Sequence, residues 1–133
     1  MKTTEYIIVV SLLLLGIAGC KMDKGPVEPE TDTDPISFVN HIQPIFDNYC
    51  TSCHPSSGNL DLSQGQSYSQ LVNTSASGYN ALRVKPGDPE NSVLYKKIDG
   101  SGAYGSNMPL GSSLPQSDIN KIKAWIEQGA PNN

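Results

Sequence analysis

The alternation of apolar and polar residues predicts an amphipathic helix over residues 35–49. Asp34 is a suitable N-cap, Pro35 suits the first helical position, and Pro44 falls on the polar side, where it should kink the helix or end it early. The apolar side of this helix consists of Ile36, Phe38, Val39, Ile42, Phe46 and Tyr49. We therefore expect the helix to pack against a core along one face.

A second helix is predicted after Asp88 and Pro89. These two residues repeat the pattern of Asp34 and Pro35, an N-cap residue followed by proline at the first helical position. Leu94 and Ile98 lie four residues apart and give this second helix an apolar edge. Gly100 should end it, because glycine is the usual residue just past a helix C-terminus.

The last expected helix begins near Ser117, a suitable N-cap, and ends at Gly129 and Pro131. Its apolar stripe consists of Ile119, Ile122, Trp125 and Ile126. A shorter helix is expected around residues 67–72. Since no period-two strand pattern or internal repeat appears, the sequence predicts an all-α fold of short helices and long loops.

Residues 1–19 have the pattern of a signal peptide. Lys2 gives a weakly positive start, residues 6–18 are almost wholly apolar, and small residues precede Cys20. This ending resembles the lipobox of bacterial lipoproteins, in which cleavage occurs before the cysteine and its thiol receives a lipid. The alternative is an uncleaved anchor. A helix over residues 6–18 would be only about 20 Å long against a hydrocarbon core of about 30 Å, so its length favours cleavage.

Residues 20–34 begin with the lipidated cysteine and continue as a polar, acidic and proline-containing stretch without apolar periodicity, which predicts a disordered tether. Residues 35–133 have the length of one domain. We expect an exported protein, lipid-anchored in a bacterial cell membrane, with its domain in the periplasm or at the cell surface. Lys21 is not the aspartate that enteric bacteria use to retain lipoproteins in the inner membrane, which favours the outer membrane by analogy.

The formal net charge of the 133-residue chain is −4 at pH 7. Binding of nucleic acid would call for a basic patch, which the sequence lacks. The modest acidic charge instead favours partners with basic surfaces.

Cys50, Cys53 and His54 form the motif C-x-x-C-H, the attachment signature of a c-type haem. Two cysteines three positions apart share one face of a helical turn, so they can present two sulfur atoms to the two vinyl groups of one haem. The histidine that follows can bind the iron through its imidazole. The motif therefore predicts one covalently attached haem, and long loops are expected where a chain wraps such a group.

The two cysteines of the motif have three other interpretations. A redox dithiol would follow a thioredoxin-like strand, whereas a helix is expected here. A zinc site needs about four ligands, and only His41 could join the three residues of the motif. A structural disulfide remains open in an oxidising compartment. The haem assignment accounts for every cysteine, because Cys20 would carry the lipid.

Met108 is the candidate for the second axial position of the iron. It is the only methionine outside the signal and the tether, and it lies in a glycine-rich loop before Pro109. A methionine that merely fills the core is the alternative. His41 is a competing ligand, although its place beside polar neighbours on the helix favours a solvated side chain. An open iron site is the third option.

These motifs together resemble the class I-like c-type cytochromes, and more narrowly the planctomycete-type cytochrome c domain. The resemblance rests on I-x-P-I-F before C-x-x-C-H, then G-N-L-D-L, Y-x-x-L-V, R-V-x-P-G-D-P-E-x-S-x-L-Y-x-K-I, M-P and W-I-E-Q-G-A-P. It implies a cytochrome c-like fold of three to five short helices around one haem, in which the first and last helices cross. It also implies thioethers at Cys50 and Cys53, with His54 proximal and Met108 distal.

The resemblance implies one-electron transfer between redox proteins whose identity the sequence does not give. Arg83 is a candidate contact to the haem propionates, with an ordinary surface charge as the alternative. Pro55 departs from the family, because many cytochromes have a small residue there. Rival functions are a haem-based sensor or gas-binding module, a haem-free lipoprotein adaptor, and, more weakly, a haem peroxidase. We expect no other enzymatic activity, since no catalytic constellation stands out.

Overall fold

The computed structural model describes residues 35–133. The predicted signal peptide, the candidate lipidation at Cys20, the predicted acidic tether and the predicted cap at Asp34 all lie outside these residues. Within residues 35–133, no helix has both the length and the apolar character needed to cross a membrane.

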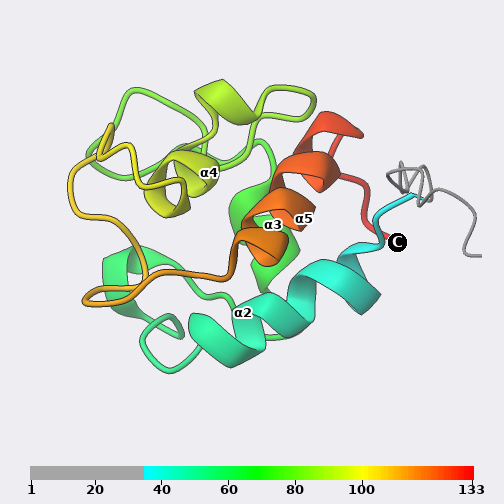
Figure 1. Cartoon of the computed structure of the whole chain (residues 1–133), viewed down its shortest axis with the longest axis horizontal. Coiled ribbons are helices and arrows are strands. Elements are labelled where there is room, and N and C mark those ends of the chain that lie inside the picture. The colour runs from blue at the N-terminus through cyan, green and yellow to red at the C-terminus, as the bar shows by residue number, and fades with distance from the viewer. Residues whose placement is uncertain (1–34) are drawn as a thin grey trace, which may run out of the picture. The chain divides into compact units, whose positions relative to one another are not determined.

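The described part of the chain consists of helices and loops (Figure 1). Its α-helices are α2 (Gln43–Tyr49), α3 (Ser67–Leu71), α4 (Val93–Ile98) and α5 (Gln116–Glu127). Short turns of other helix types are η1 (Phe38–Ile42), η2 (Ser57–Asn59) and η3 (Pro89–Asn91). Only isolated β-bridges join the loops, and no sheet forms in residues 35–133. The predicted all-α class is therefore confirmed.

The first helix begins later than predicted. It starts at Phe38 in a wide π turn, and Ser37 is its cap, with an Oγ atom that accepts a hydrogen bond from the backbone N–H of Asn40 at 3.2 Å. The backbone changes from π-helical to α-helical at Gln43, one residue before Pro44. Proline has no N–H to donate, so it is tolerated in the first turn of α2, and the helix continues to Tyr49.

The helix predicted after Asp88 is divided into η3 and α4 by Ser92, whose backbone is extended (φ −104°, ψ 121°). Asp88 caps η3 as predicted, accepting from the N–H of Asn91 at 3.2 Å. The buried hydroxyl of Ser92 accepts from the N–H of Lys85 and donates to the carbonyl oxygen of Asp88, both at 2.8 Å. These side-chain bonds hold the chain out of the helical conformation at this point.

Helix α5 begins at Gln116, one residue before the predicted cap Ser117, and Pro115 occupies the cap position without a side-chain bond. The predicted stripe of Ile119, Ile122, Trp125 and Ile126 is buried along its whole length. Helix α5 packs against η1 and α4 (Figure 1).

The centre of this packing is aromatic. The ring centroids of Trp125 and Phe38 lie 5.3 Å apart. The ring of Phe38 also packs edge-on against that of Tyr68, with centroids 5.2 Å apart. The indole N–H of Trp125 donates to the carbonyl oxygen of Pro131, and the hydroxyl of Tyr68 donates to that of Ala130, both at 2.9 Å. The segment after α5 is thereby fixed against α5 itself and against α3, which follows the C-x-x-C-H motif.

Candidate functional site

The C-x-x-C-H motif lies in a series of tight turns directly after α2. The N–H of Cys50 donates to the carbonyl oxygen of Phe46 at 2.8 Å, which continues the helical pattern for one more residue. The carbonyl oxygen of Cys50 then accepts from the N–H groups of Cys53 (3.1 Å) and His54 (2.9 Å). The backbone thus holds both cysteines and the histidine within one turn, as their spacing predicts.

The two cysteines differ in burial. Cys50 is half-buried and packs against the hydrophobic core, whereas Cys53 is exposed, and neither thiol is in a disulfide. Burial raises the pKa of the Cys50 thiol to about 11. A redox-active dithiol works through a thiolate of low pKa. The environment of Cys50 therefore opposes the dithiol interpretation.

His54 is held through both its backbone and its ring. Its carbonyl oxygen accepts from the N–H of Leu62 at 2.7 Å, and its Nδ1 atom lies 2.7 Å from the carbonyl oxygen of Ser57. A carbonyl oxygen can only accept, so Nδ1 must carry the proton. Nε2 then presents its lone pair, which is the form of histidine that binds a metal.

His41 has the opposite arrangement. It is exposed on η1, and its Nδ1 atom accepts a hydrogen bond from the backbone N–H of Ser37 at 2.9 Å. In the neutral ring the proton must then be on Nε2. That nitrogen cannot bind a metal unless the proton or the bond to Ser37 is lost, so the structure sets the two histidines apart.

Met108 closes the glycine-rich loop of residues 99–108. Its side chain is half-buried and packs against the same core cluster as Cys50. Its N–H donates to the carbonyl oxygen of Lys97 in α4 at 2.7 Å, and its peptide bond with Pro109 is cis. The backbone of Met108 is therefore anchored to α4.

Arg83 is buried, so the alternative of an ordinary surface charge is wrong. Its Nη1 atom donates to the carbonyl oxygen of Gln70 at 2.9 Å and its Nη2 atom to that of Asn59 at 2.7 Å. The guanidinium thereby joins the end of α3 to the loop after the C-x-x-C-H motif. No carboxylate of residues 35–133 forms an ion pair with it.

Sequence reasoning missed the role of Ser57, because the group that meets His54 is a backbone carbonyl and any residue type could supply it. The one available signal was the Ser57-Gly58 dipeptide, which is typical of turns. Gly58 adopts a left-handed conformation with φ +66°, and a β-carbon there would lie 3.8 Å from Cε1 of His54.

A small hollow of about 160 Å³ lies apart from these residues. It is lined by side chains of η1 and α3 and of the segments around them, and none of the candidate site residues lines it. Residues 35–133 contain no cluster of three or more His, Cys, Asp or Glu side chains grouped as a metal site.

Comparison with known proteins adds no further assignment: no family model, no curated protein and no solved structure matches this chain.

Proposed function

We propose that this protein is a monohaem c-type cytochrome that carries single electrons between redox proteins outside the inner membrane. Cys50 and Cys53 would hold the haem through thioethers, and His54 and Met108 would be the axial ligands of its iron. The bound haem supplies reversible one-electron chemistry, while the protein sets its potential.

The observation that carries this proposal is the hydrogen bond between His54 and Ser57. It fixes the tautomer that leaves Nε2 available, and it does so at the histidine of the C-x-x-C-H motif. The hydrogen bond at His41 fixes the other tautomer. This contrast favours Met108 over His41 as the second ligand.

The surroundings of these ligands suit a haem of relatively high potential. A thioether from methionine raises the potential compared with a second histidine. Arg83 provides a buried positive charge whose hydrogen-bond partners in residues 35–133 are neutral oxygens, which suits an anionic propionate as a further partner. The donated Nδ1 hydrogen bond of His54 acts in the opposite sense, because it increases the basicity of the imidazole.

We further propose that the domain is exported and anchored through a lipid on Cys20, with residues 21–34 as a tether. This part of the proposal rests on the sequence of residues 1–34 alone. The proposed partners are redox proteins that can approach a small domain tethered to the membrane.

The test is a set of absorption spectra of the protein expressed with c-type maturation machinery, oxidised and reduced, for wild type, Met108→Ala and His41→Ala. We expect a covalent haem spectrum with a long-wavelength methionine–iron band that only Met108→Ala removes. Loss of the band in His41→Ala would favour bis-histidine ligation. Rapid binding of carbon monoxide by the reduced wild type would favour the gas-binding alternative, and absence of haem would favour an adaptor.

A further inference from the structure

We propose that Tyr79, Tyr104 and Lys97 form a latch that holds the loop of residues 99–108 closed and so controls how readily Met108 leaves the iron. This inference rests on the proposed function, because it gives the latch a consequence only if Met108 is an axial ligand. The three residues come from two loops and from α4, and they are named here the tyrosine latch.

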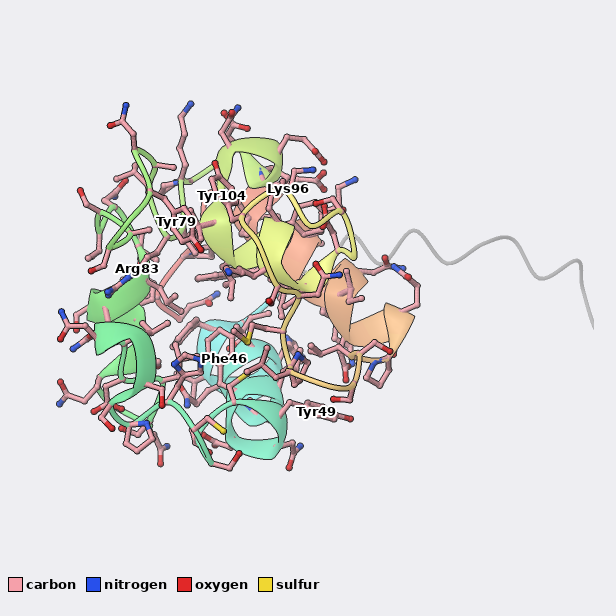
Figure 2. The ribbon with its side chains drawn as sticks, turned by 90° about the vertical axis from the view of Figure 1, so that its left-hand side faces the viewer. Phe46, Tyr49, Tyr79, Arg83, Lys96 and Tyr104 are labelled. Carbon is pink, nitrogen blue, oxygen red and sulfur yellow. The ribbon has the colours of Figure 1, made fainter. Side chains whose placement is uncertain are left out.

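The contacts of the tyrosine latch join segments far apart in the sequence. The hydroxyl of Tyr79 donates to the carbonyl oxygen of Tyr104 at 2.7 Å, and the two rings meet at 5.0 Å and 66°. The ammonium of Lys97 lies 5.3 Å from the centre of the Tyr79 ring, within the range of a cation–π contact. Figure 2 shows Tyr79 beside Tyr104, away from Phe46 and Tyr49.

The loop has few attachments of its own to the core. Between residues 100 and 107, Tyr104 is the only side chain that is not exposed. Gly100, Gly102 and Gly105 all have positive φ values, so the loop contains several residues with wide conformational freedom. The single half-buried side chain of residues 100–107, that of Tyr104, contacts Tyr79. This contact is therefore the main side-chain attachment of the loop.

Lys97 connects the latch to Met108. Its carbonyl oxygen accepts from the N–H of Met108 at 2.7 Å, and its ammonium donates to the carbonyl oxygen of Ser106 at 3.3 Å. The same residue thus contacts Tyr79 through its side chain and Met108 through its backbone. An opening of the Tyr79–Tyr104 contact would leave the bonds of Lys97 to Met108 and Ser106 as the remaining attachments of this end of the loop.

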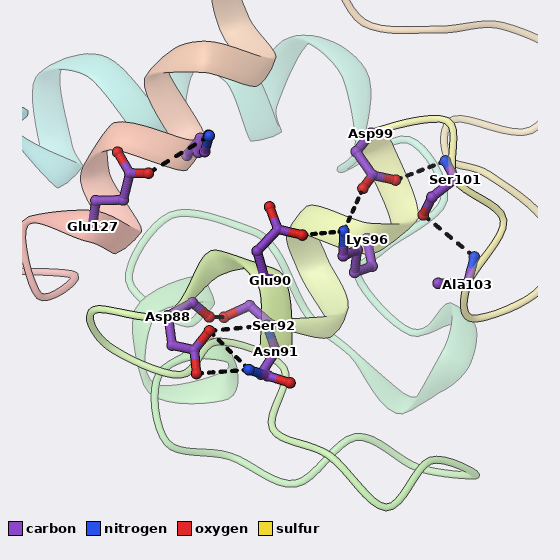
Figure 3. Close-up of polar contacts among 10 residues, drawn as sticks. Asp88, Glu90, Asn91, Ser92, Lys96, Asp99, Ser101, Ala103 and Glu127 are labelled. Carbon is purple, nitrogen blue, oxygen red and sulfur yellow. Dashed lines mark hydrogen bonds and ion pairs between the residues drawn. The ribbon is translucent and has the colours of Figure 1, made fainter.

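The start of the loop is fixed independently of the latch. The carboxylate of Asp99 accepts from the N–H of Ser101 at 2.8 Å and pairs with Lys96 at 3.1 Å (Figure 3). An opening of the latch would therefore loosen the part of the loop after Ser101 and weaken the support of the Lys97–Met108 bond, while the beginning of the loop stays on α4.

The experiment compares wild type, Tyr79→Phe, Tyr79→Ala and Tyr68→Phe, each as the full chain with its haem. Tyr68→Phe is the matched control, because it also removes one bond from a tyrosine hydroxyl to a backbone carbonyl, but at Ala130. Hydrogen–deuterium exchange of the Met108 amide reports opening of the loop. Titration of the oxidised protein with imidazole reports displacement of the methionine.

We expect Tyr79→Phe to accelerate exchange at Met108 and to tighten imidazole binding, each by about fivefold, as for the loss of one ordinary hydrogen bond. Tyr79→Ala should exceed this effect, since the aromatic and cation–π contacts are lost as well. Tyr68→Phe should leave both quantities at the wild-type value.

The latch is disproved if either quantity is unchanged in both Tyr79 variants, or if Tyr68→Phe changes both to the same extent. A spectrum of Met108→Ala identical to that of wild type would instead disprove the proposed axial ligand, and the latch with it. A methionine band that is present in wild type and lost in Met108→Ala, together with unchanged amide exchange and imidazole binding in the Tyr79 variants, would disprove the latch alone.

Discussion

The Nδ1 atom of His54 lies 2.7 Å from the carbonyl oxygen of Ser57, so the ring is oriented by the turn that follows the C-x-x-C-H motif. The turn depends on Gly58, whose φ of +66° belongs to the left-handed region that favours glycine. The ring of His54 is therefore oriented by a backbone carbonyl, and the turn that places this carbonyl relies on a glycine.

Replacement of Gly58 by alanine should destabilise this turn. A β-carbon in the left-handed conformation costs about 1 kcal/mol, whereas its distance of 3.8 Å from Cε1 of His54 is an ordinary contact that adds no strain. We expect Gly58→Ala to lower the free energy of unfolding by about that amount in urea denaturation. Ser56→Ala, at an exposed neighbour, is the control. Equal stability of both variants would show that the turn does not require glycine.

The half-buried thiol of Cys50 should be unreactive at neutral pH in protein produced without haem. Its pKa is raised to about 11 by burial, and only the thiolate is nucleophilic. In the Cys53→Ser variant, alkylation of Cys50 by iodoacetamide should keep increasing up to about pH 11. The Cys50→Ser variant, which leaves the exposed Cys53, is the comparison. Identical pH profiles would mean that the haem-free chain does not bury Cys50.

Asp99 should stabilise the fold at neutral pH and lose this effect in acid. Burial acts to raise the pKa of Asp99, but hydrogen bonds from Ser101 and Lys96 outweigh it and lower the pKa. Because the unfolded state binds the proton more readily, the contribution is present above about pH 4 and is lost as the pH falls through the folded-state pKa.

Asp99→Asn should therefore cost about 1 kcal/mol at pH 7, the value of an ordinary net hydrogen bond, and progressively less below pH 4. Urea denaturation at several pH values measures this difference. Glu127→Gln, which breaks an exposed ion pair of 3.7 Å with Lys123, should change the stability little at any pH. A constant cost of Asp99→Asn across the pH range would contradict the assignment.

Arg83 should resist replacement by lysine. The planar guanidinium donates to two carbonyl oxygens, those of Asn59 and Gln70, which the single ammonium of lysine cannot reproduce in the same geometry. We expect Arg83→Lys to lower the unfolding free energy by about 2 kcal/mol, the range of a hydrogen bond to a charged group. Lys85→Arg, the reverse exchange at an exposed ion pair, should be nearly neutral. A neutral Arg83→Lys would show that these bonds are dispensable.

Trp125 should be the most sensitive position of the core. It is fully buried, contacts Phe38 at 5.3 Å and donates its indole N–H to Pro131. Trp125→Phe loses both side-chain volume and this hydrogen bond, so we expect it to lower the free energy of unfolding by about 2 kcal/mol. Urea denaturation monitored by circular dichroism measures this change. Tyr49→Phe, at an exposed aromatic residue, should stay within about 0.5 kcal/mol of wild type. Similar losses of unfolding free energy in the two variants would contradict the central position of Trp125 in the core.

The sequence by itself determined which segments are helical and which residues carry the candidate chemistry. The stripe from Ile119 to Ile126 is buried as its spacing predicts, because an apolar face with a period of 3.6 residues must find a core. The spacing of Cys50, Cys53 and His54 likewise placed them within one turn, since that geometry is local. The helix boundaries followed less closely from the sequence. The first helix begins at Phe38 instead of Pro35, and the last begins at Gln116, one residue before Ser117.

Only the tertiary structure decided how the candidate residues are held. It placed the Ser57 carbonyl against His54 and gave His41 the opposite tautomer. It also buried Arg83 between the end of α3 and the loop after the C-x-x-C-H motif, and it brought Tyr79 into contact with Tyr104. Most of these partners are backbone groups or lie in segments remote in sequence. No residue type or periodicity encodes a backbone carbonyl as a partner, and a contact across 25 residues exists only after the loops have closed around the core.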